Sequence, residues 1–257
     1  SGGTSVAVSG AGAIGMNVVL TDVKAFIEDS AIASARDVIV SAASSSGIAA
    51  VTGALAASVA AGGGTSVGVS IGAAVAINYI GYNLDGSQDP AAVHAYIQNS
   101  SVDADRDVKV SAAASQTIGA ITLAGSVGIA GGGGTGVAVA GSGAVALNMI
   151  GADVKSYIDG DVAIGGGVTD GIQARNLSVT AADASTITAL VGAASIAVSF
   201  GSTGVSVAIG VSYGHNMIAS DVLASIANVD QGIRATGDVL VKAEELSTIR
   251  AISAAAA

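Results

Sequence analysis

The chain has 257 residues, a formal net charge of −10, and few charged (11%) or aromatic (3%) residues. Its 9 Lys and Arg residues are too scattered to displace the counterions of nucleic acid, which argues against a nucleic-acid partner. The absence of Cys excludes disulfides, thiolate metal sites and cysteine nucleophiles.

The first predicted element is a long strand after Thr4. Residues 6, 8, 14 and 16 are bulky, whereas the residues between them are Ser, Ala and Gly as far as Asn17. This period of two is typical of a β-strand, and neither face carries a charge. Because a face of small residues would let a second sheet approach closely, we expect both faces of the strand to be covered.

A more polar stretch over residues 22–30 comes next. Arg36 and Asp37 then lead into a second apolar arm, which runs to the glycines at 62–64. Glycine is the usual residue at tight reversals, because it adopts positive φ without penalty. We therefore expect a long Gly/Ala-rich hairpin, tipped by glycine, in each unit.

This order of elements occurs four times, in repeats of about 60–70 residues. The repeats span residues 1–60, 61–130, 131–200 and 201–257, the last one truncated, with insertions at 84–92 and 161–170 that we expect in loops. Stacked units bury a common core, so the sequence predicts one continuous all-β domain: a repetitive β-solenoid or stacked β-sheet. We also expect the chain to be a stretch of a longer protein.

Two residue types mark equivalent positions in the four repeats. A Thr begins each repeat and an Asn follows 13 residues later; the two sets are Thr4, Thr65, Thr135, Thr203 and Asn17, Asn78, Asn148, Asn216. Stacked Asn side chains can hydrogen-bond along the axis, because each amide both donates and accepts. We expect both sets to form structural ladders, with the Asn set inward.

The runs at residues 32–42 and 235–243 resemble the coils of filamentous-haemagglutinin-type adhesins, and more broadly the giant repeat-containing surface proteins of bacteria. The resemblance covers all four repeats and is one of repeat style and composition. It implies a secreted, elongated β-solenoid at the cell surface that serves adhesion, biofilm or envelope structure. We therefore expect a non-catalytic segment of an extracellular fibre or adhesin, whose partners are further copies or further repeats.

Two short segments match the sequence patterns of catalytic or cofactor-binding motifs. Residues 10–15 match the dinucleotide fingerprint G-x-G-x-x-G, but no equivalent glycines recur in the second repeat. Ser70 lies in a G-x-S-x-G sequence, and the available bases are His94, expected in solvent, and His215, expected as a packing variant. Both motifs fit small residues of a packed strand better than an active site, so an enzyme is not expected.

Two sets of acidic residues are weak candidates for Ca²⁺, the one cofactor considered. They are Asp22, Asp153, Asp221 and Asp37, Asp107, Asp238. Stacking would bring these carboxylates together as hard oxygen ligands. Capping of turns by Asp explains both sets without a metal.

Two other functions stay open. Residues 38–84, 110–152 and 185–220 contain no Asp, Glu, Lys or Arg, which also suits a membrane-embedded protein with Gly-rich transmembrane hairpins or an outer-membrane β-barrel. Against it, the apolar residues are mainly small and no aromatic girdle is present. The second alternative is a carbohydrate- or surface-binding adhesin module that uses the insertions.

Overall fold

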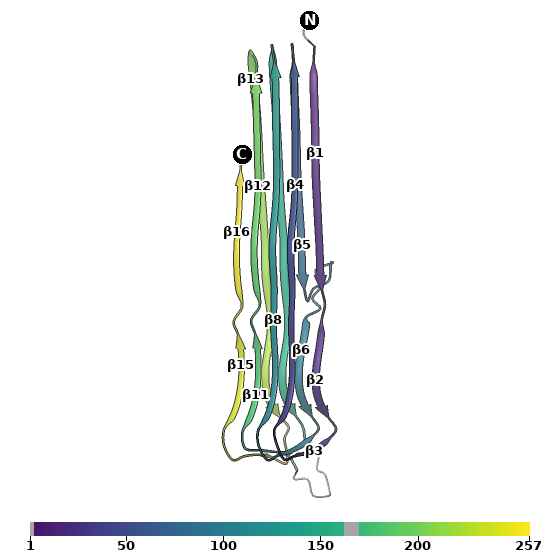
Figure 1. Ribbon diagram of the computed structural model, residues 1–257, viewed down its shortest axis with the longest axis vertical. Helices are drawn as coiled ribbons and strands as arrows, with labels where there is room; N and C mark the ends of the chain where they lie inside the picture. The colour runs from purple at the N-terminus through teal and green to yellow at the C-terminus, as the bar shows by residue number, and fades with distance from the viewer. Residues whose placement is uncertain (1–2, 162–169) are drawn as a thin grey trace.

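The computed structural model describes residues 3–161 and 170–257, and within these ranges it contains strands and turns but no helix (Figure 1). The all-β prediction is confirmed. The strands form a tall, narrow stack of four coils that begin at β1, β5, β9 and β13. Each coil has a descending arm, a short basal strand and an ascending arm, in the orientation of Figure 1.

Equivalent strands of the four coils have similar lengths. The descending arms are β1 (Ser5–Val19) with β2 (Asp22–Glu28), β5 (Ser66–Ile80) with β6 (Ala91–Gln98), β9 (Thr135–Asp159) and β13 (Thr203–Ala227). The basal strands are β3 (Ala31–Ser34), β7 (Ser101–Ala104), β10 (Ile172–Ala174) and β14 (Ile233–Ala235). The ascending arms are β4 (Val38–Gly62), β8 (Val108–Gly132), β11 (Leu177–Asp183) with β12 (Thr186–Phe200), and β15 (Val239–Glu245) with β16 (Thr248–Ala256).

Every strand pairs in parallel with its equivalent in the next coil. The descending sheet has the order β1-β5-β9-β6-β2 with β13 beside β9, and the ascending sheet has the order β15-β11-β8-β12-β16 with β4 beside β8. The basal strands form a third sheet in the order β14-β10-β7-β3. The registers are those of a repeat: Asn17 lies opposite Asn78, and Ile48 lies opposite Ile118.

The glycine tips join two different sheets. β4 leads through the tip at residues 62–64 into β5, but β4 pairs with β8, whereas β5 pairs with β1 and β9. The reversal is therefore an arch, not the hydrogen-bonded hairpin that we expected from the sequence. Each arm pairs with the equivalent arm of the neighbouring coil, which satisfies backbone N–H and C=O groups along it.

The space between the two large sheets is filled differently along the strands. Near the basal strands it holds branched aliphatic residues such as Val93, Val108 and Ile158. A row of Ile lies midway up, contributed by both sheets: Ile48, Ile80, Ile118, Ile150 and Ile187. Nearer the tips the core consists largely of Ala, so the gap between the sheets has to be narrow there.

Glycine permits the closest approach of the two sheets. A Cβ on Gly68 of β5 would lie 2.5 Å from the carbonyl oxygen of Ile129 in β8, and a Cβ on Gly72 would overlap the carbonyl oxygen of Gly125. Real Cβ atoms do not come this close to backbone atoms. The two backbones are therefore in direct contact near the tips, as the face of small residues predicts.

Candidate association surface

The bulky residues of the descending sheet point outward near the tips. In β5, Ser66 and Ser70 are fully buried between the sheets, whereas Ile71 is 57% exposed. An ordinary sheet places its bulky residues in the core and its small polar ones in solvent. The tip half of this molecule has the opposite arrangement, because only small side chains fit between sheets whose backbones touch.

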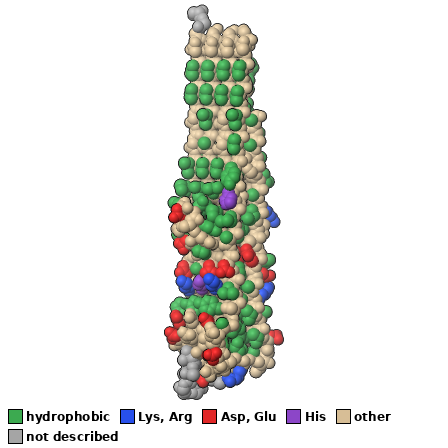
Figure 2. Space-filling model, turned by 180° about the vertical axis from the view of Figure 1, so that it is seen from behind, with side chains coloured by type: hydrophobic (Ala, Val, Ile, Leu, Met, Phe, Trp, Pro, Cys, Tyr) green, Lys and Arg blue, Asp and Glu red, His purple; other side chains and the backbone are tan. Residues whose placement is uncertain are grey.

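The outward residues align into rows across the coils. Two rows consist entirely of valine: Val6, Val67, Val137, Val205 and Val8, Val69, Val139, Val207. Val8 is 74% exposed. Figure 2 shows this half of the face as rows of hydrophobic side chains without charge, and the acidic and basic side chains gather in the other half.

The ascending sheet is also apolar on its outer side. Leu55 is 83% exposed and leans over Gly125 of the next coil, where a Cβ would meet its Cδ2 atom at 2.5 Å. A ridge of four outward side chains crosses the coils: Val51, Ile121, Leu190 and Ile252. Beside it lies a shallow groove of about 820 Å³, whose outward residues include Ala49, Gly119 and Thr188. Arg250 of β16 lines the same groove, at the last-coil position of the row that Thr188 occupies. On the tip side of that row, both broad faces carry no charged residue and have no partner in one chain.

The four Asn residues form one continuous ladder of side-chain hydrogen bonds. Nδ2 of Asn17 donates to Oδ1 of Asn78, Asn78 donates to Asn148, and Asn148 donates to Asn216, each at 2.8 Å. Asn78 and Asn148 are fully buried. The inward placement follows from parity, since each Asn is on the same side of its strand as the small residues.

The four Thr residues lie together at the tips. Thr135 and Thr203 face each other at the start of β9 and β13. Thr4 and Thr65 immediately precede β1 and β5, where the amide of Ser5 donates to the carbonyl of Thr65 at 2.9 Å. The set marks the point at which each descending arm enters the sheet.

The first acidic set lies on the outer side of the descending sheet, away from the tips. Asp22, Asp153 and Asp221 align, and Ala92 occupies the position of the second coil. Lys24 and Lys155 bind Asp22 and Asp153, each at 2.8 Å. A row of cations therefore runs beside the row of acids and offsets their repulsion.

The expectation for His94 is wrong. His94 is aligned with Lys24 and Lys155, is half-buried, and lies with its Nε2 3.0 Å from Oδ2 of Asp153. It occupies the position of the two lysines in the second coil and contacts the same aspartate as Lys155. His215 lies opposite Leu147 on the outer face, which is the packing position that the repeats predict.

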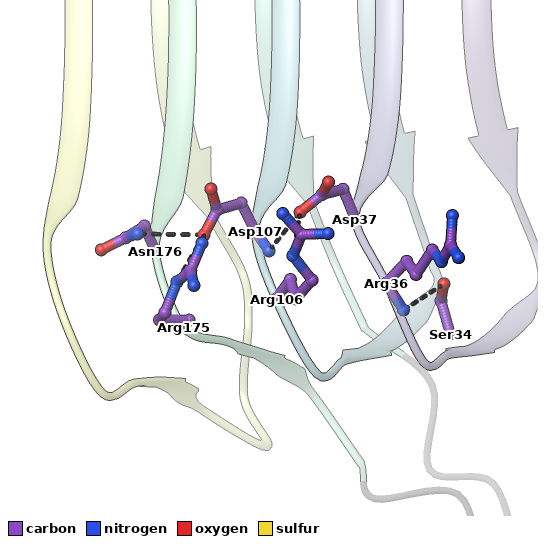
Figure 3. A network of polar contacts seen from close by, with 7 residues as sticks. All are labelled: Ser34, Arg36, Asp37, Arg106, Asp107, Arg175 and Asn176. Carbon is purple, nitrogen blue, oxygen red and sulfur yellow. Dashed lines mark hydrogen bonds and ion pairs between the residues drawn. The ribbon is translucent and has the colours of Figure 1, made fainter.

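Asp37 and Asp107 of the second acidic set lie at the start of the ascending arms (Figure 3), and in the third coil Asn176 occupies the equivalent position. Asp37 accepts a hydrogen bond from the amide of Asp107 at 3.1 Å, and Asn176 accepts one from the amide of Asp238 at 2.9 Å. Asp107 accepts from the side chain of Asn176 at 2.9 Å and from Arg175 at 3.0 Å. These bonds, led by the one from Asn176, lower the pKa of Asp107.

The arrangement of both acidic sets is that of caps and ion pairs. Within the ranges that the structure describes, no three His, Cys, Asp or Glu side chains are grouped so as to hold a metal ion. Asp22 and Asp153 each have a lysine neighbour, and Asp107 has Arg175 and Asn176 as neighbours.

The residues of the catalytic motifs do not converge. Gly10, Gly12 and Gly15 lie inside β1, which is continuous and is not followed by a helix. Ser70 is buried between the sheets, whereas His215 is exposed on the outer face. Neither motif has the strand–turn–helix context that its chemistry requires.

The insertion at 84–92 includes a turn closed by its own side chains. The amide and hydroxyl of Ser87 both donate to Oδ1 of Asp85, at 2.8 and 2.6 Å, and Asn83 donates to the Ser87 hydroxyl. The two bonds from Ser87, the hydroxyl one first, lower the pKa of Asp85. Of the second insertion, residues 162–169 lie outside the described ranges.

Two groups were missed at the sequence level. Phe26, Tyr96 and Tyr157 stack face to face, with ring centroids 5.2 and 4.9 Å apart. Alignment of the repeats would have found this stack, because the three aromatic residues occupy one position. Asp183 is 1% exposed and accepts from Ser185 at 2.7 Å and from Ser220 at 2.8 Å. The other coils have Ser44, Ala114 and Glu245 at that position, so the repeats gave no signal.

Comparisons with protein-family models, with curated proteins and with solved structures give no match for this chain. Among the described residues, no helix has the length and apolar character needed to cross a membrane.

Proposed function

We propose that this chain is a structural, non-catalytic segment of an extracellular bacterial fibre or adhesin, and that it associates side by side through the uncharged outer faces of its tip half. The observation that carries the proposal is the pair of valine rows, whose members point away from the core in every coil. The repeat style shared with bacterial surface adhesins supports the extracellular setting.

Exposed apolar surface of this kind indicates a partner. Monomeric proteins rarely expose contiguous apolar patches beyond a few hundred Å². Here uncharged rows cover both broad faces on the tip side of Arg250. On the face that Figure 2 shows, the charged side chains gather in the other half. Lateral contact between tip halves buries the valine rows and leaves the charged half in water.

The role of the valine rows in association can be tested by substituting lysine for one valine in each of the two inner coils. Val69→Lys with Val139→Lys places adjacent ammonium groups on the outer face without entering the space between the sheets. Each buried ammonium costs several kcal/mol, so association should weaken at least about a hundredfold. Sedimentation velocity over a concentration series measures the change.

The matched control is Ser41→Lys with Ser111→Lys, which adds the same charge at adjacent outward positions in the charged half. This variant should sediment like the wild type. Equal loss of association in both variants would mean that net charge, not the valine rows, governs assembly, and the proposed surface would be wrong.

The membrane-embedded function is the second candidate, because the same uncharged faces suit lipid. Flotation of the wild-type chain with phosphatidylcholine vesicles separates the two functions. The fibre proposal predicts assemblies in buffer that stay at the bottom of the gradient. A chain that is monomeric in buffer and floats with vesicles would replace the fibre by the membrane function.

A further inference from the structure

Two tyrosines lie against each other on the outer side of the descending sheet. Tyr96 of β6 and Tyr157 of β9 occupy one position in the second and third coils, and their rings are parallel with centroids 4.9 Å apart. Both residues are half-buried, and Phe26 of the first coil stacks on the other side of Tyr96. The backbone pairing of their strands therefore holds the two phenol rings face to face.

The other tyrosines differ from this pair in exposure or in geometry. Tyr79 and Tyr82 are only 6% and 4% exposed, and their rings are 6.2 Å apart and inclined at 58°. Tyr213 is 54% exposed and lies opposite Val145. Of the 5 tyrosines, all of which the structure describes, Tyr96 and Tyr157 are the pair that combines parallel contact with access to solvent.

Paired phenols of this kind can be coupled by one-electron oxidation. An oxidant removes one electron and one proton from each hydroxyl, and the two phenoxyl radicals join through the ring carbons next to the C–O carbons. The hydrogen on each joined carbon then moves to the phenol oxygen, so both rings become aromatic again. The product, dityrosine, has two hydrogens fewer than two tyrosines. One molecule of hydrogen peroxide takes up the two electrons and two protons and becomes two molecules of water.

The side chains beside the pair suit this reaction. Glu28 and Asp159 lie in the next outward row, two residues further along their strands. Burial raises the pKa of Tyr157, and the neighbouring Tyr96, Asp159 and Glu28 raise it further. The Tyr157 phenol is therefore protonated at neutral pH, and the two carboxylates can accept the proton that it loses on oxidation.

The rings have room to approach each other. A C–C bond is about 1.5 Å long, so the two ring carbons have to move together from the stacking distance. The rings are on the outer side of the sheet, and tipping them toward each other displaces no core side chain. Ser225 occupies the equivalent position in the fourth coil, so the neighbour of Tyr157 on that side is small.

We propose that Tyr96 and Tyr157 form a site of oxidative cross-linking, at which a peroxide-dependent one-electron oxidant joins the second and third coils by a dityrosine bond. The chain has no Cys, so this bond supplies a covalent link between coils that disulfides cannot. The site lies within one chain and does not depend on association through the outer faces.

Treatment of the full chain with a peroxidase and hydrogen peroxide tests the site. The product should run as a monomer on a denaturing gel, have a mass lower by two hydrogens, and show the fluorescence of dityrosine. Peptide mapping should join the segment that contains Tyr96 to the segment that contains Tyr157. Tyr157→Phe should abolish this product, because a phenylalanine ring has no hydroxyl from which to form a phenoxyl radical.

Two matched controls keep the pair intact. Tyr82→Phe removes a phenol from the buried, inclined pair and should leave the yield unchanged. Tyr213→Phe removes the exposed phenol outside the stack, at which two copies could be joined, and should also leave the monomeric product unchanged.

A rescue variant tests the geometry independently of Tyr157. Phe26→Tyr in the Tyr157→Phe chain restores two stacked phenols, at the 5.2 Å separation of the first two rings, so the monomeric product should return with its link between position 26 and Tyr96. A folded chain, by circular dichroism, that forms links only between copies would overturn the proposal. So would a monomeric product that forms equally well without Tyr157 or that maps to Tyr79 and Tyr82.

Discussion

Gly72→Val should destabilise the fold by about 3 kcal/mol or more, because overpacking a rigid core forces the backbone to move. A side chain at Gly72 would collide with the backbone carbonyl of Gly125 in the opposite sheet, and no flexible side chain is available to give way. The sheets would have to separate along a row of coils. Urea denaturation followed by circular dichroism measures the loss as a lower midpoint.

Gly143→Val is the matched control. Gly143 lies on the outer side of β9, and a Cβ there would meet no atom within 4 Å. Valine favours strands more than glycine does, so the control should keep or raise the midpoint. Equal destabilisation by both substitutions would show that the sheets are not in backbone contact at Gly72.

Asn78→Asp should cost about 3–5 kcal/mol at neutral pH, the usual penalty for an uncompensated buried charge. Asn78 is fully buried and has to accept from Asn17 and donate to Asn148. A carboxylate only accepts, so it would face the amide oxygen of Asn148 without a proton between them. Chemical denaturation at several pH values measures the cost.

The pH dependence of this variant has a definite sign. Burial disfavours the ionised form, so the pKa of the introduced carboxyl should be higher in the folded than in the unfolded chain, where it is about 3.9. The folded state then binds the proton more tightly, and the destabilisation should shrink as the pH falls through the raised pKa. Asn17→Asp, at the exposed end of the ladder, should cost much less. Equal costs at both positions would contradict a buried ladder.

Most of the fold could be predicted from the sequence because the chain consists of repeats. Because equivalent residues of stacked coils must face one another, the alignment of the four Asn residues and the period of two together predict their common, inward row. The same alignment predicts the Ile row at Ile48 and Ile118. These predictions need only local spacing and the symmetry of the stack.

Other features depend on contacts that local spacing does not contain. Glycine tips suit a hairpin and an arch equally well, and the arch is favoured because each arm pairs with the equivalent arm of the next coil. The environment of His94 depends on the insertion, which aligns Ala92 with Asp153 and His94 with Lys155. Asp183 is buried because hydroxyls from both sheets reach it, including Ser220 from a strand far along the chain.

The central claim is that the tip half has its bulky residues outside and that these faces are covered by other copies. Small-angle scattering of the wild-type chain over a wide concentration range tests it most directly. The claim predicts elongated particles whose mass and length grow with concentration. A compact, soluble monomer of constant mass over the whole range would contradict it.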